Sequence, residues 1–349
     1  MNSTTITSEI LLQNIQPILS LGFAGFLLAI LLTPIYTRFA YKYHWWKKPR
    51  KESLTGEKAV VFQKLHNEKH KRHIPTMAGL VCIIAIAAIT ILFNFDRRET
   101  WLPLATLLLF GGLGLVDDLS NVFLRSDKRG GLTPKTQIAA LVALSALGSW
   151  WFYEKLGYNA IALPYFGDVT IGVLYIPLFI LVVVATSKSV SITDGLDGLA
   201  GGLLAMAFGV FSVLSLLQGN FMLASFCCTV VGVMLAYTWF NIHPARFFMG
   251  QTGSTALGAV LGVVAMLTNS LFLLPIIGCI FVVEAGSSIV QVFSKKVFKR
   301  KLLLSAPLHH HFEAIGWPET KVTMRFWILG QVAGVLALLI AVLGGFVVL

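Results

Sequence analysis

The chain has 349 residues, of which 56% are hydrophobic and only 12% are charged, and its formal net charge is +11. Soluble domains carry about 25% charged residues, so the composition excludes a soluble protein with one anchor and indicates an integral membrane protein. In such a protein the distribution of basic residues matters more than their sum, and we expect no nucleic-acid partner. The four cysteines lie in apolar runs without metal-type spacing and are expected to serve packing.

Ten runs of about 20 apolar residues are each long enough to cross a bilayer as a helix. They cover residues 16–38, 75–95, 101–117, 135–153, 170–187, 198–217, 220–240, 253–269, 271–293 and 326–348. We therefore predict an all-α integral membrane protein with about ten transmembrane helices in a single polytopic domain, residues 1–349. The first run lacks a preceding basic segment and cleavage site, so a cleaved signal peptide is not expected.

The basic residues give the orientation. All but three of the 27 Lys and Arg residues (Arg97, Arg98 and Lys155) lie after odd-numbered spans or at the adjoining helix ends. Because cytoplasmic loops carry the excess of Lys and Arg, both termini are predicted to lie outside the cytoplasm. The predicted cytoplasmic loops are residues 39–74, 118–134, 188–197, 241–252 and 294–325.

Every notable polar cluster falls on this cytoplasmic side. The clusters are residues 69–77, Asp117 with Asp118, and residues 191–198, 241–254 and 309–313. A structural protein has no need to collect carboxylates, histidines and glycines on one membrane face. The clusters therefore predict a single cytoplasmic active-site cleft.

Asp117 and Asp118 end the third apolar run. Adjacent helical residues point about 100° apart, so these carboxylates cannot serve one atom in the same way. Acidic residues are disfavoured at a helix C-terminus, which favours a functional role over a solvated helix end.

Residues 191–198 (SITDGLDG) place two carboxylates three positions apart between apolar runs. Asp194 and Asp197 would share one face of a helical turn, and the glycines would let a ligand or backbone approach. The alternative is a solvated loop with an aspartate that caps the next helix. With Asp117 and Asp118 they make four carboxylates on a basic surface. Oxygen ligands suit Mg²⁺, so the pattern indicates phosphoryl transfer with one substrate in the membrane.

Two further segments carry weaker signals. Residues 247–254 (FFMGQTGS) join aromatics to a small, polar helix start, which can cradle a phosphate or stack a base but is equally common as plain structure. In the ninth span, Glu284 is as suited to linking helices as to contacting substrate. Gln291 lies nearer the cytoplasm and is better placed for a ligand.

Residues 309–311 are three consecutive histidines in the segment SAPLHHHFE. Histidine can bind metal, move protons or recognise an anion. Adjacent side chains diverge on a helix, so we favour substrate recognition over metal binding.

Together these motifs resemble the polyprenyl-phosphate N-acetylhexosamine-1-phosphate transferases. The resemblance covers nearly the whole chain and rests on IPTMAG (74–79), VDD (116–118), TDGLDGLA (193–200), NIHPARFFMG (241–250) and APLHHHFE (306–313). The histidine motif is the most specific. It is similar to the branch that transfers phospho-N-acetylmuramoyl-pentapeptide, and separates it from relatives that transfer N-acetylglucosamine phosphate.

The resemblance implies a Mg²⁺-dependent enzyme of the bacterial inner membrane. Undecaprenyl phosphate would attack the β-phosphate of UDP-N-acetylmuramoyl-pentapeptide and release UMP. The implied catalytic residues are Asp117 (base or lipid-phosphate partner), Asp118, Asp194 and Asp197, and the implied metal ligands are Asp117, Asp118, Asp194 and position 251. The implied substrate-binding residues are Lys71, Thr76, Asn241, Phe248, Gly250, Gln291, His309, His310 and His311. A homodimer is also expected from the resemblance.

The chain departs from the family's pattern at four positions. Gln251 stands where the family has a metal-binding aspartate, Lys188 and Ser191 replace two asparagines, and Ala78 replaces a glycine. The alternative is therefore a weakened or inactive member of the fold that binds nucleotide-sugar or partner proteins. A UDP-N-acetylhexosamine:polyprenyl-phosphate transferase is a further alternative. A secondary transporter would fit the span count, but would place its ionisable residues near the bilayer midplane.

Overall fold

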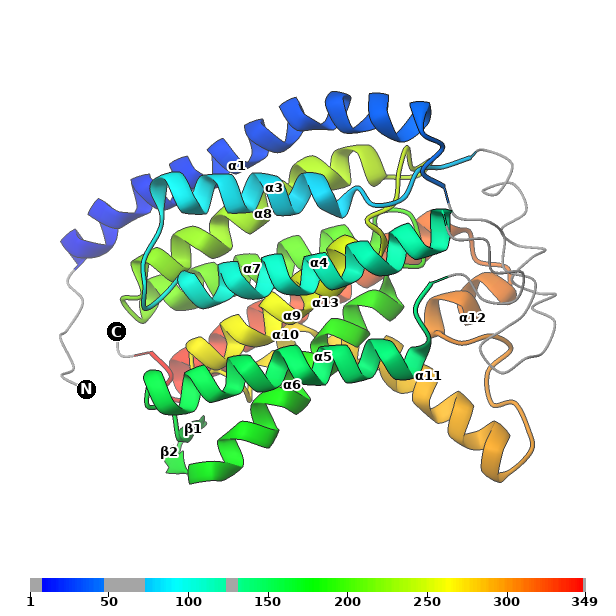
Figure 1. Cartoon of the computed structure of the whole chain (residues 1–349). Coiled ribbons are helices and arrows are strands. Elements are labelled where there is room, and N and C mark those ends of the chain that lie inside the picture. The colour runs from blue at the N-terminus through cyan, green and yellow to red at the C-terminus, as the bar shows by residue number, and fades with distance from the viewer. Residues whose placement is uncertain (1–7, 47–72, 124–130, 348–349) are drawn as a thin grey trace.

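The computed structural model describes residues 8–46, 73–123 and 131–347, which form a bundle of long helices (Figure 1). The helices are α1 (Ser8–Lys42), α3 (Gly79–Phe93), α4 (Trp101–Phe123), α5 (Pro134–Trp150), α6 (Tyr175–Thr193), α7 (Leu199–Leu217), α8 (Phe221–Asn241), α9 (Gly250–Leu267), α10 (Leu274–Ile277), α11 (Cys279–Val297), α12 (Leu308–Ala314) and α13 (Glu319–Leu343). A π-helical turn (Trp151–Lys155) extends α5, and a 3-10 turn (Gly172–Leu174) precedes α6. The predicted helical membrane architecture is confirmed.

A short β-hairpin is the exception to the all-α prediction. Strand β1 (Ala160–Leu163) pairs antiparallel with β2 (Gly167–Thr170), with Ala160 opposite Thr170 and Leu163 opposite Gly167. The backbone N–H of Ala162 donates to Asn269 Oδ1 (3.0 Å), which ties the hairpin to the turn after α9. The sequence did not indicate this hairpin, because strands of four residues are too short for an alternating pattern to be recognised.

Each of the ten apolar runs falls on a helix. Within the described residues, seven helices are long and apolar enough to cross a membrane, namely α1, α4, α6, α7, α8, α9 and α13. Helix α3 has only 15 residues, and the run 271–293 is divided at Gly278 into α10 and α11. Ten spans and extracytoplasmic termini therefore stay predictions. The start of α1 and the end of α13 lie at the same end of the bundle (Figure 1).

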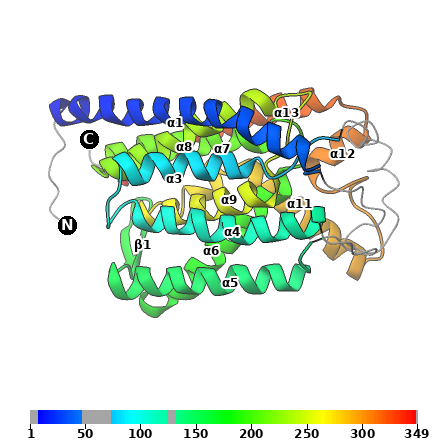
Figure 2. The ribbon, with the colours of Figure 1, turned by 45° about the horizontal axis from the view of Figure 1, so that its top comes forward.

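Helix α9 forms the centre of the bundle. Its most apolar window is 94% buried, against 28% for α1 and for α13. A helix buried on all sides packs against neighbours all round, and α9 contacts α3, α4, α6 and α7 (Figures 1 and 2). The outer helices instead expose apolar side chains such as Phe23, Leu31 and Val332, as lipid-facing helices do.

Glycines hold the first turn of α9 close to its neighbours. A Cβ on Gly79 would lie 2.2 Å from the nitrogen of Gly253, and a Cβ on Gly114 would lie 2.2 Å from the carbonyl oxygen of Gln251. Small residues allow this close approach of helices in lipid. The start of α9 is thereby fixed between α3 and α4.

Candidate active site

The predicted polar clusters meet at the end of the bundle where α12 lies, opposite the start of α1 (Figure 1). Asp118 on α4 contacts the start of α9, and the turn after α6 contacts both the α8–α9 connection and α13. His309 on α12 lies against Gly195 in the same turn. Segments far apart in the sequence therefore converge, whereas Lys71 lies outside the described residues.

Asp118 joins α4 to the first turn of α9. Its carboxylate is fully buried, and Oδ2 accepts hydrogen bonds from the N–H (2.9 Å) and the hydroxyl (2.8 Å) of Thr252. The N-terminus of a helix favours a negative charge. Gly250 has φ +74°, and a Cβ there would lie 2.4 Å from Asp118 Oδ2 and 2.8 Å from Thr76 Oγ1. Glycine is therefore required beside this carboxylate.

Asp117 faces the opposite neighbour, α5. Its Oδ1 accepts from the backbone N–H of Leu132 (2.7 Å) and from Gln137 Nε2 (2.8 Å), while Asn121 Nδ2 donates to Oδ2 over 3.3 Å. The 100° step along a helix separates the two neighbouring carboxylates in this way. Helix α4 continues to Phe123, so the pair lies inside the helix and does not end it as predicted.

A small pocket lies next to Asp117, between α4, α5, α6 and α9. Its polar lining includes Asp117, Gln137, Lys188, Gln251 and Thr255. Lys188 Nζ donates to Gln137 Oε1 (2.8 Å). Gln251 Oε1 accepts from the hydroxyls of Ser191 (2.8 Å) and Thr255 (3.1 Å).

The turn between α6 and α7 holds Asp194 and Asp197. Asp194 closes α6 with non-helical backbone angles, and Gly198 in the left-handed region (φ +77°) precedes α7 without a side-chain cap. The predictions of a helical turn with both aspartates on one face, and of an aspartate cap on the next helix, are therefore wrong. The chain reverses direction at Gly198 instead, because glycine adopts the left-handed region without a steric penalty.

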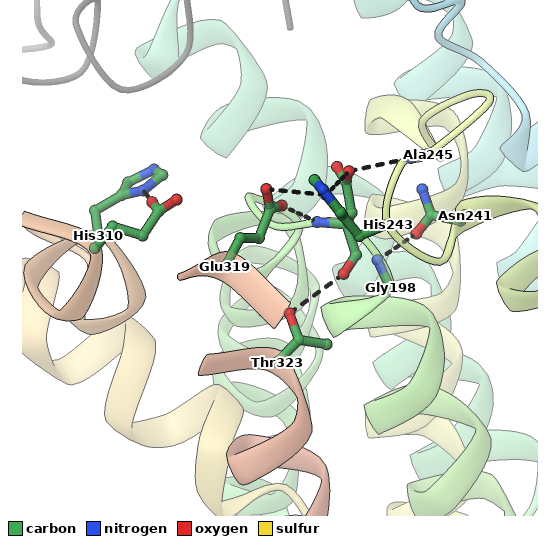
Figure 3. Close-up of polar contacts among 9 residues, drawn as sticks. Gly198, Asn241, His243, Ala245, His310, Glu319 and Thr323 are labelled. Carbon is green, nitrogen blue, oxygen red and sulfur yellow. Dashed lines mark hydrogen bonds and ion pairs between the residues drawn. The ribbon is translucent and has the colours of Figure 1, made fainter. Parts of the chain in front are cut away.

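Asp197 is buried and is bonded to two other parts of the chain. Figure 3 shows its partners His243, Ala245, Glu319 and Thr323. Its Oδ2 accepts from the N–H of Ala245 (3.1 Å) and lies 3.0 Å from His243 Nδ1. Its N–H donates to Glu319 Oε1 (2.5 Å), and its carbonyl accepts from the Thr323 hydroxyl (3.2 Å). The aspartate thus joins the α6–α7 turn to the α8–α9 connection and to α13.

Asn241 at the end of α8 is hydrogen-bonded to the α6–α7 turn. Its Oδ1 accepts from the N–H of Gly198 (2.9 Å), as Figure 3 shows, and its Nδ2 donates to the carbonyl of Phe247 (2.7 Å). Phe248 lies next along the α8–α9 connection, half-buried, and its N–H donates to the carbonyl of Pro75 (2.8 Å). The amide of Asn241 is therefore used to shape the site.

His243 and Glu319 are site residues that the sequence did not single out. With Asp197 they form the only group of three His, Cys, Asp or Glu residues in the described parts of the chain whose ligand atoms lie within 4.8 Å. His243 Nδ1 lies 3.6 Å from Glu319 Oε2. The sequence held one signal for His243, which is its position inside the NIHPARFFMG motif. It held none for Glu319, because Glu319 lies 122 residues from Asp197. An imidazole between two carboxylates suits a hydrogen-bonded cluster better than a site for Mg²⁺, which prefers oxygen ligands.

The three consecutive histidines have three different environments on and around α12. His309 is fully buried: its Nδ1 lies 2.7 Å from Glu284 Oε2, and its N–H donates to Glu284 Oε1 (3.1 Å). His310 Nδ1 lies 2.7 Å from Glu313 Oε2. His311 is half-buried, and its Nδ1 accepts from the N–H of Leu304 (3.2 Å).

Gln291 holds the connection between α11 and α12. Its Oε1 accepts from the N–H groups of Leu302 (3.1 Å) and Leu303 (3.0 Å), and its Nε2 donates to the carbonyl of Leu303 (3.0 Å). Glu284 likewise links α11 to α12 through His309. Both side chains position α12 relative to the bundle.

Known proteins resemble this chain over nearly its whole length. The sequence model of glycosyl transferase family 4 matches residues 100–269. A phospho-N-acetylmuramoyl-pentapeptide-transferase of Chloroflexus aurantiacus is 35% identical and covers 98% of this chain and 94% of its own. Proteins of the same name from Anoxybacillus flavithermus (36% identical, 95% of this chain and 99% of its own) and from Geobacillus sp. (36%, 91% and 96%) match similarly.

The chain belongs to the phospho-N-acetylmuramoyl-pentapeptide-transferase family. The family predicted from the sequence motifs is thereby confirmed, and with it membership of a family of transferase enzymes. The predicted roles of individual residues stay predictions, and the contacts above are the observations on which they depend.

Three of the four departures predicted from the family resemblance lie together. Lys188 and Gln251 line the pocket beside Asp117, and Ser191 donates to Gln251. Phosphoryl transfer generally uses a divalent metal, which prefers charged oxygen ligands. At position 251 the residues do not fit such an ion, because a neutral amide oxygen already accepts two hydroxyl hydrogen bonds and an ammonium group lines the same pocket.

Proposed function

We propose that the protein transfers phospho-N-acetylmuramoyl-pentapeptide from UDP-N-acetylmuramoyl-pentapeptide to undecaprenyl phosphate, giving lipid I and UMP for peptidoglycan synthesis. The observation that carries this proposal is the similarity, over 91–98% of the chain, to proteins named for that transfer. The convergence of Asp117, Asp118, Asp194 and Asp197 at one end of the bundle supports it. On the basic-residue distribution, this end faces the cytoplasm of a bacterial inner membrane.

The reaction forms one bond and breaks one. An oxygen of the lipid phosphate attacks the β-phosphorus of the nucleotide-sugar, the bond from that phosphorus to the bridging oxygen breaks, and UMP leaves. Such a transfer needs mainly orientation of the two phosphates and stabilisation of charge. Rigid placement of the participating side chains is therefore the property to look for in the structure.

Asp117 is the residue we assign to the acceptor phosphate. Two N–H donors on Oδ1 hold the carboxylate in one orientation at the edge of the pocket. Leu113 of the same pocket is partly exposed and offers apolar surface to an acceptor with a polyprenyl tail. Direct deprotonation is a small part of the task, because a phosphate is already largely anionic near pH 7.

The other predicted residues are assigned to the nucleotide-sugar. Asn241 ends α8, and Phe248 lies in the α8–α9 connection that follows. The partly exposed ring of Phe248 can stack on uracil. Thr76 and Gly250 lie against Asp118 at the start of α9. His309 lies against the α6–α7 turn. The three histidines His309, His310 and His311 are assigned to sugar-phosphate recognition together with Gln291 and Lys71. A homodimer is expected from the family.

Magnesium is the ion that we expect the carboxylates of Asp117, Asp118 and Asp194 to bind, as in phosphoryl transfer generally. Gln251 does not fit that role. No step above depends on the ion. The observation at Gln251 favours a second candidate function, a catalytically inactive protein that binds the nucleotide-sugar without turnover.

Release of UMP from UDP-N-acetylmuramoyl-pentapeptide by the full chain, with undecaprenyl phosphate, decides between the two. We expect release that depends on both substrates, measured over a Mg²⁺ series that includes EDTA. Absence of release at every Mg²⁺ concentration, with recovery in Gln251→Asp, would overturn the proposal and favour the inactive binder. An inactive Lys135→Gln control would point to a damaged preparation, since Lys135 is exposed on α5.

A further inference from the structure

Two separate substitutions on α6 converge on one pocket. Lys188 and Ser191 are three residues apart on α6, so they share one face of the helix. Ser191 donates to Gln251 on α9, and Lys188 donates to Gln137 on α5. Gln137 in turn donates to Asp117 on α4 over 2.8 Å. Four helices thus contribute two hydrogen-bonded sets to one pocket, and these sets contain three of the four departures.

The charges around this pocket do not favour a divalent ion at position 251. Asp117 supplies one negative charge, Lys188 supplies one positive charge, and Gln251 supplies none. Mg²⁺ usually binds through one or two carboxylates together with phosphates, and a neighbouring ammonium group repels it. The pocket already contains the positive charge that a bound phosphate needs.

The side chain of Lys188 can also bind a ligand. The residue is half-buried, and its ammonium group carries three N–H donors, one of which is directed to Gln137. The amide of Gln137 stands between Lys188 and Asp117, hydrogen-bonded to both. A charge held in this way loses little additional freedom when it binds an anion.

We propose that Lys188 is the phosphate-binding cation of this pocket, where it binds the phosphate monoester of a prenyl lipid without a divalent ion at position 251. Leu113, which is partly exposed at the pocket, offers apolar surface for the start of a prenyl chain. The outer face of α4 exposes Leu109 and Val116, along which such a chain continues into lipid. The identity of the lipid as acceptor rests on the proposed function, but the binding itself does not.

Farnesyl phosphate binding to the full chain in detergent micelles with EDTA is the first test. We expect Lys188→Gln to weaken binding about ten-fold or more, because a charge-assisted hydrogen bond is lost, and Lys188→Arg to retain affinity within about three-fold. Lys135→Gln is the matched control, because Lys135 is an exposed lysine two residues before Gln137. Farnesol and UMP are the other arms. Their binding should not change in Lys188→Gln if the group bound is the lipid phosphate.

Mn²⁺ binding, followed by electron paramagnetic resonance, is the second test and needs no turnover. In the wild type, Gln251→Ala should leave Mn²⁺ binding unchanged, because position 251 supplies no ligand, whereas the double variant Lys188→Asn with Gln251→Asp should bind Mn²⁺ more tightly than the wild type. Gln251→Asp alone gives the same readout with a smaller gain should the double variant unfold.

Two results would overturn the inference. One is unchanged farnesyl phosphate affinity in a folded Lys188→Gln variant, which would leave Lys188 a purely structural partner of Gln137. The other is a Mn²⁺ affinity of the wild type that Gln251→Ala lowers, which would make position 251 a metal ligand. Neither result bears on UMP release by the wild type, so either one can be distinguished from failure of the proposed transfer. Conversely, absence of UMP release together with Lys188-dependent lipid binding would refute the transfer and retain the inference.

Discussion

His309 Nδ1 lies 2.7 Å from Glu284 Oε2, and both side chains are completely buried. This pair joins the short helix α12 to α11 and fixes the orientation of the imidazole. The ring then meets the α6–α7 turn, where a Cβ on Gly195 would lie 2.4 Å from His309 Nε2. The histidine motif therefore acts through its position against the aspartate-containing turn as well as through any contact with substrate.

Glu284→Ala should destabilise the protein by about 1–3 kcal/mol, because it leaves the buried groups of His309 without their acceptor. Thermal unfolding in detergent measures this loss. Glu313→Ala is the control, since Glu313 pairs with His310 at a slightly more exposed site and should cost less. An equal or smaller loss in Glu284→Ala would show that the buried pair is not a main link between α11 and α12.

Gly195→Ala should lower UMP release by about ten-fold or more while the protein still folds, because the added methyl group displaces a ring that Glu284 holds in place. Gly112→Ala is the matched control, since a Cβ at Gly112 of α4 meets no atom within 4 Å. The rate constants of both variants are to be compared at saturating substrates. Equal activities would mean that α12 and the turn can shift apart without consequence.

The membrane helices could be predicted because each needs about 20 apolar residues, and such runs stand out in the sequence. Their ends could not. Helix α4 continues six residues beyond its apolar run to Phe123, because leaving the apolar layer does not itself end a helix. The orientation rule also grouped the polar clusters on one face, and the structure brings most of them together at one end.

The contacts inside the site were beyond prediction for a different reason. Asp197 meets Glu319 across 122 residues, and Ser191 meets Gln251 across 60. Pairings of this kind depend on how the helices pack, and helical periodicity gives only the face that each side chain occupies. The sequence revealed four unusual residues, whereas only the fold reveals that Lys188 and Gln251 line one pocket and that Ser191 bonds to Gln251.

His310 should make stability sensitive to mild acid. Burial lowers its pKa from 6.5 to about 4; His309 acts in the same direction, and the bond to Glu313 and the charge of Glu284 oppose the shift. Between these values the unfolded chain binds more protons than the folded one, so stability falls as the pH falls from 6.5 towards 4. Melting temperatures between pH 7 and pH 5 should fall less steeply in His310→Asn, whose amide can still donate to Glu313. His311→Asn, with a less buried ring, should retain the wild-type slope, and equal slopes in all three proteins would contradict the prediction.

Asp117→Asn should abolish most turnover without unfolding the protein. The amide oxygen of the new side chain can still accept from Leu132 and Gln137, so the variant loses the negative charge and only the long hydrogen bond from Asn121. We expect UMP release to fall by about 100-fold or more, the range for loss of a catalytic base or charge partner. The melting temperature should change by no more than about 2–4 °C, equivalent to about 1 kcal/mol. Asp168→Asn is the matched control, because Asp168 is an exposed carboxylate of the hairpin that accepts from Asn269 over 3.0 Å. Turnover equal to that of the control would remove Asp117 from the reaction and leave its carboxylate as a link between α4 and α5.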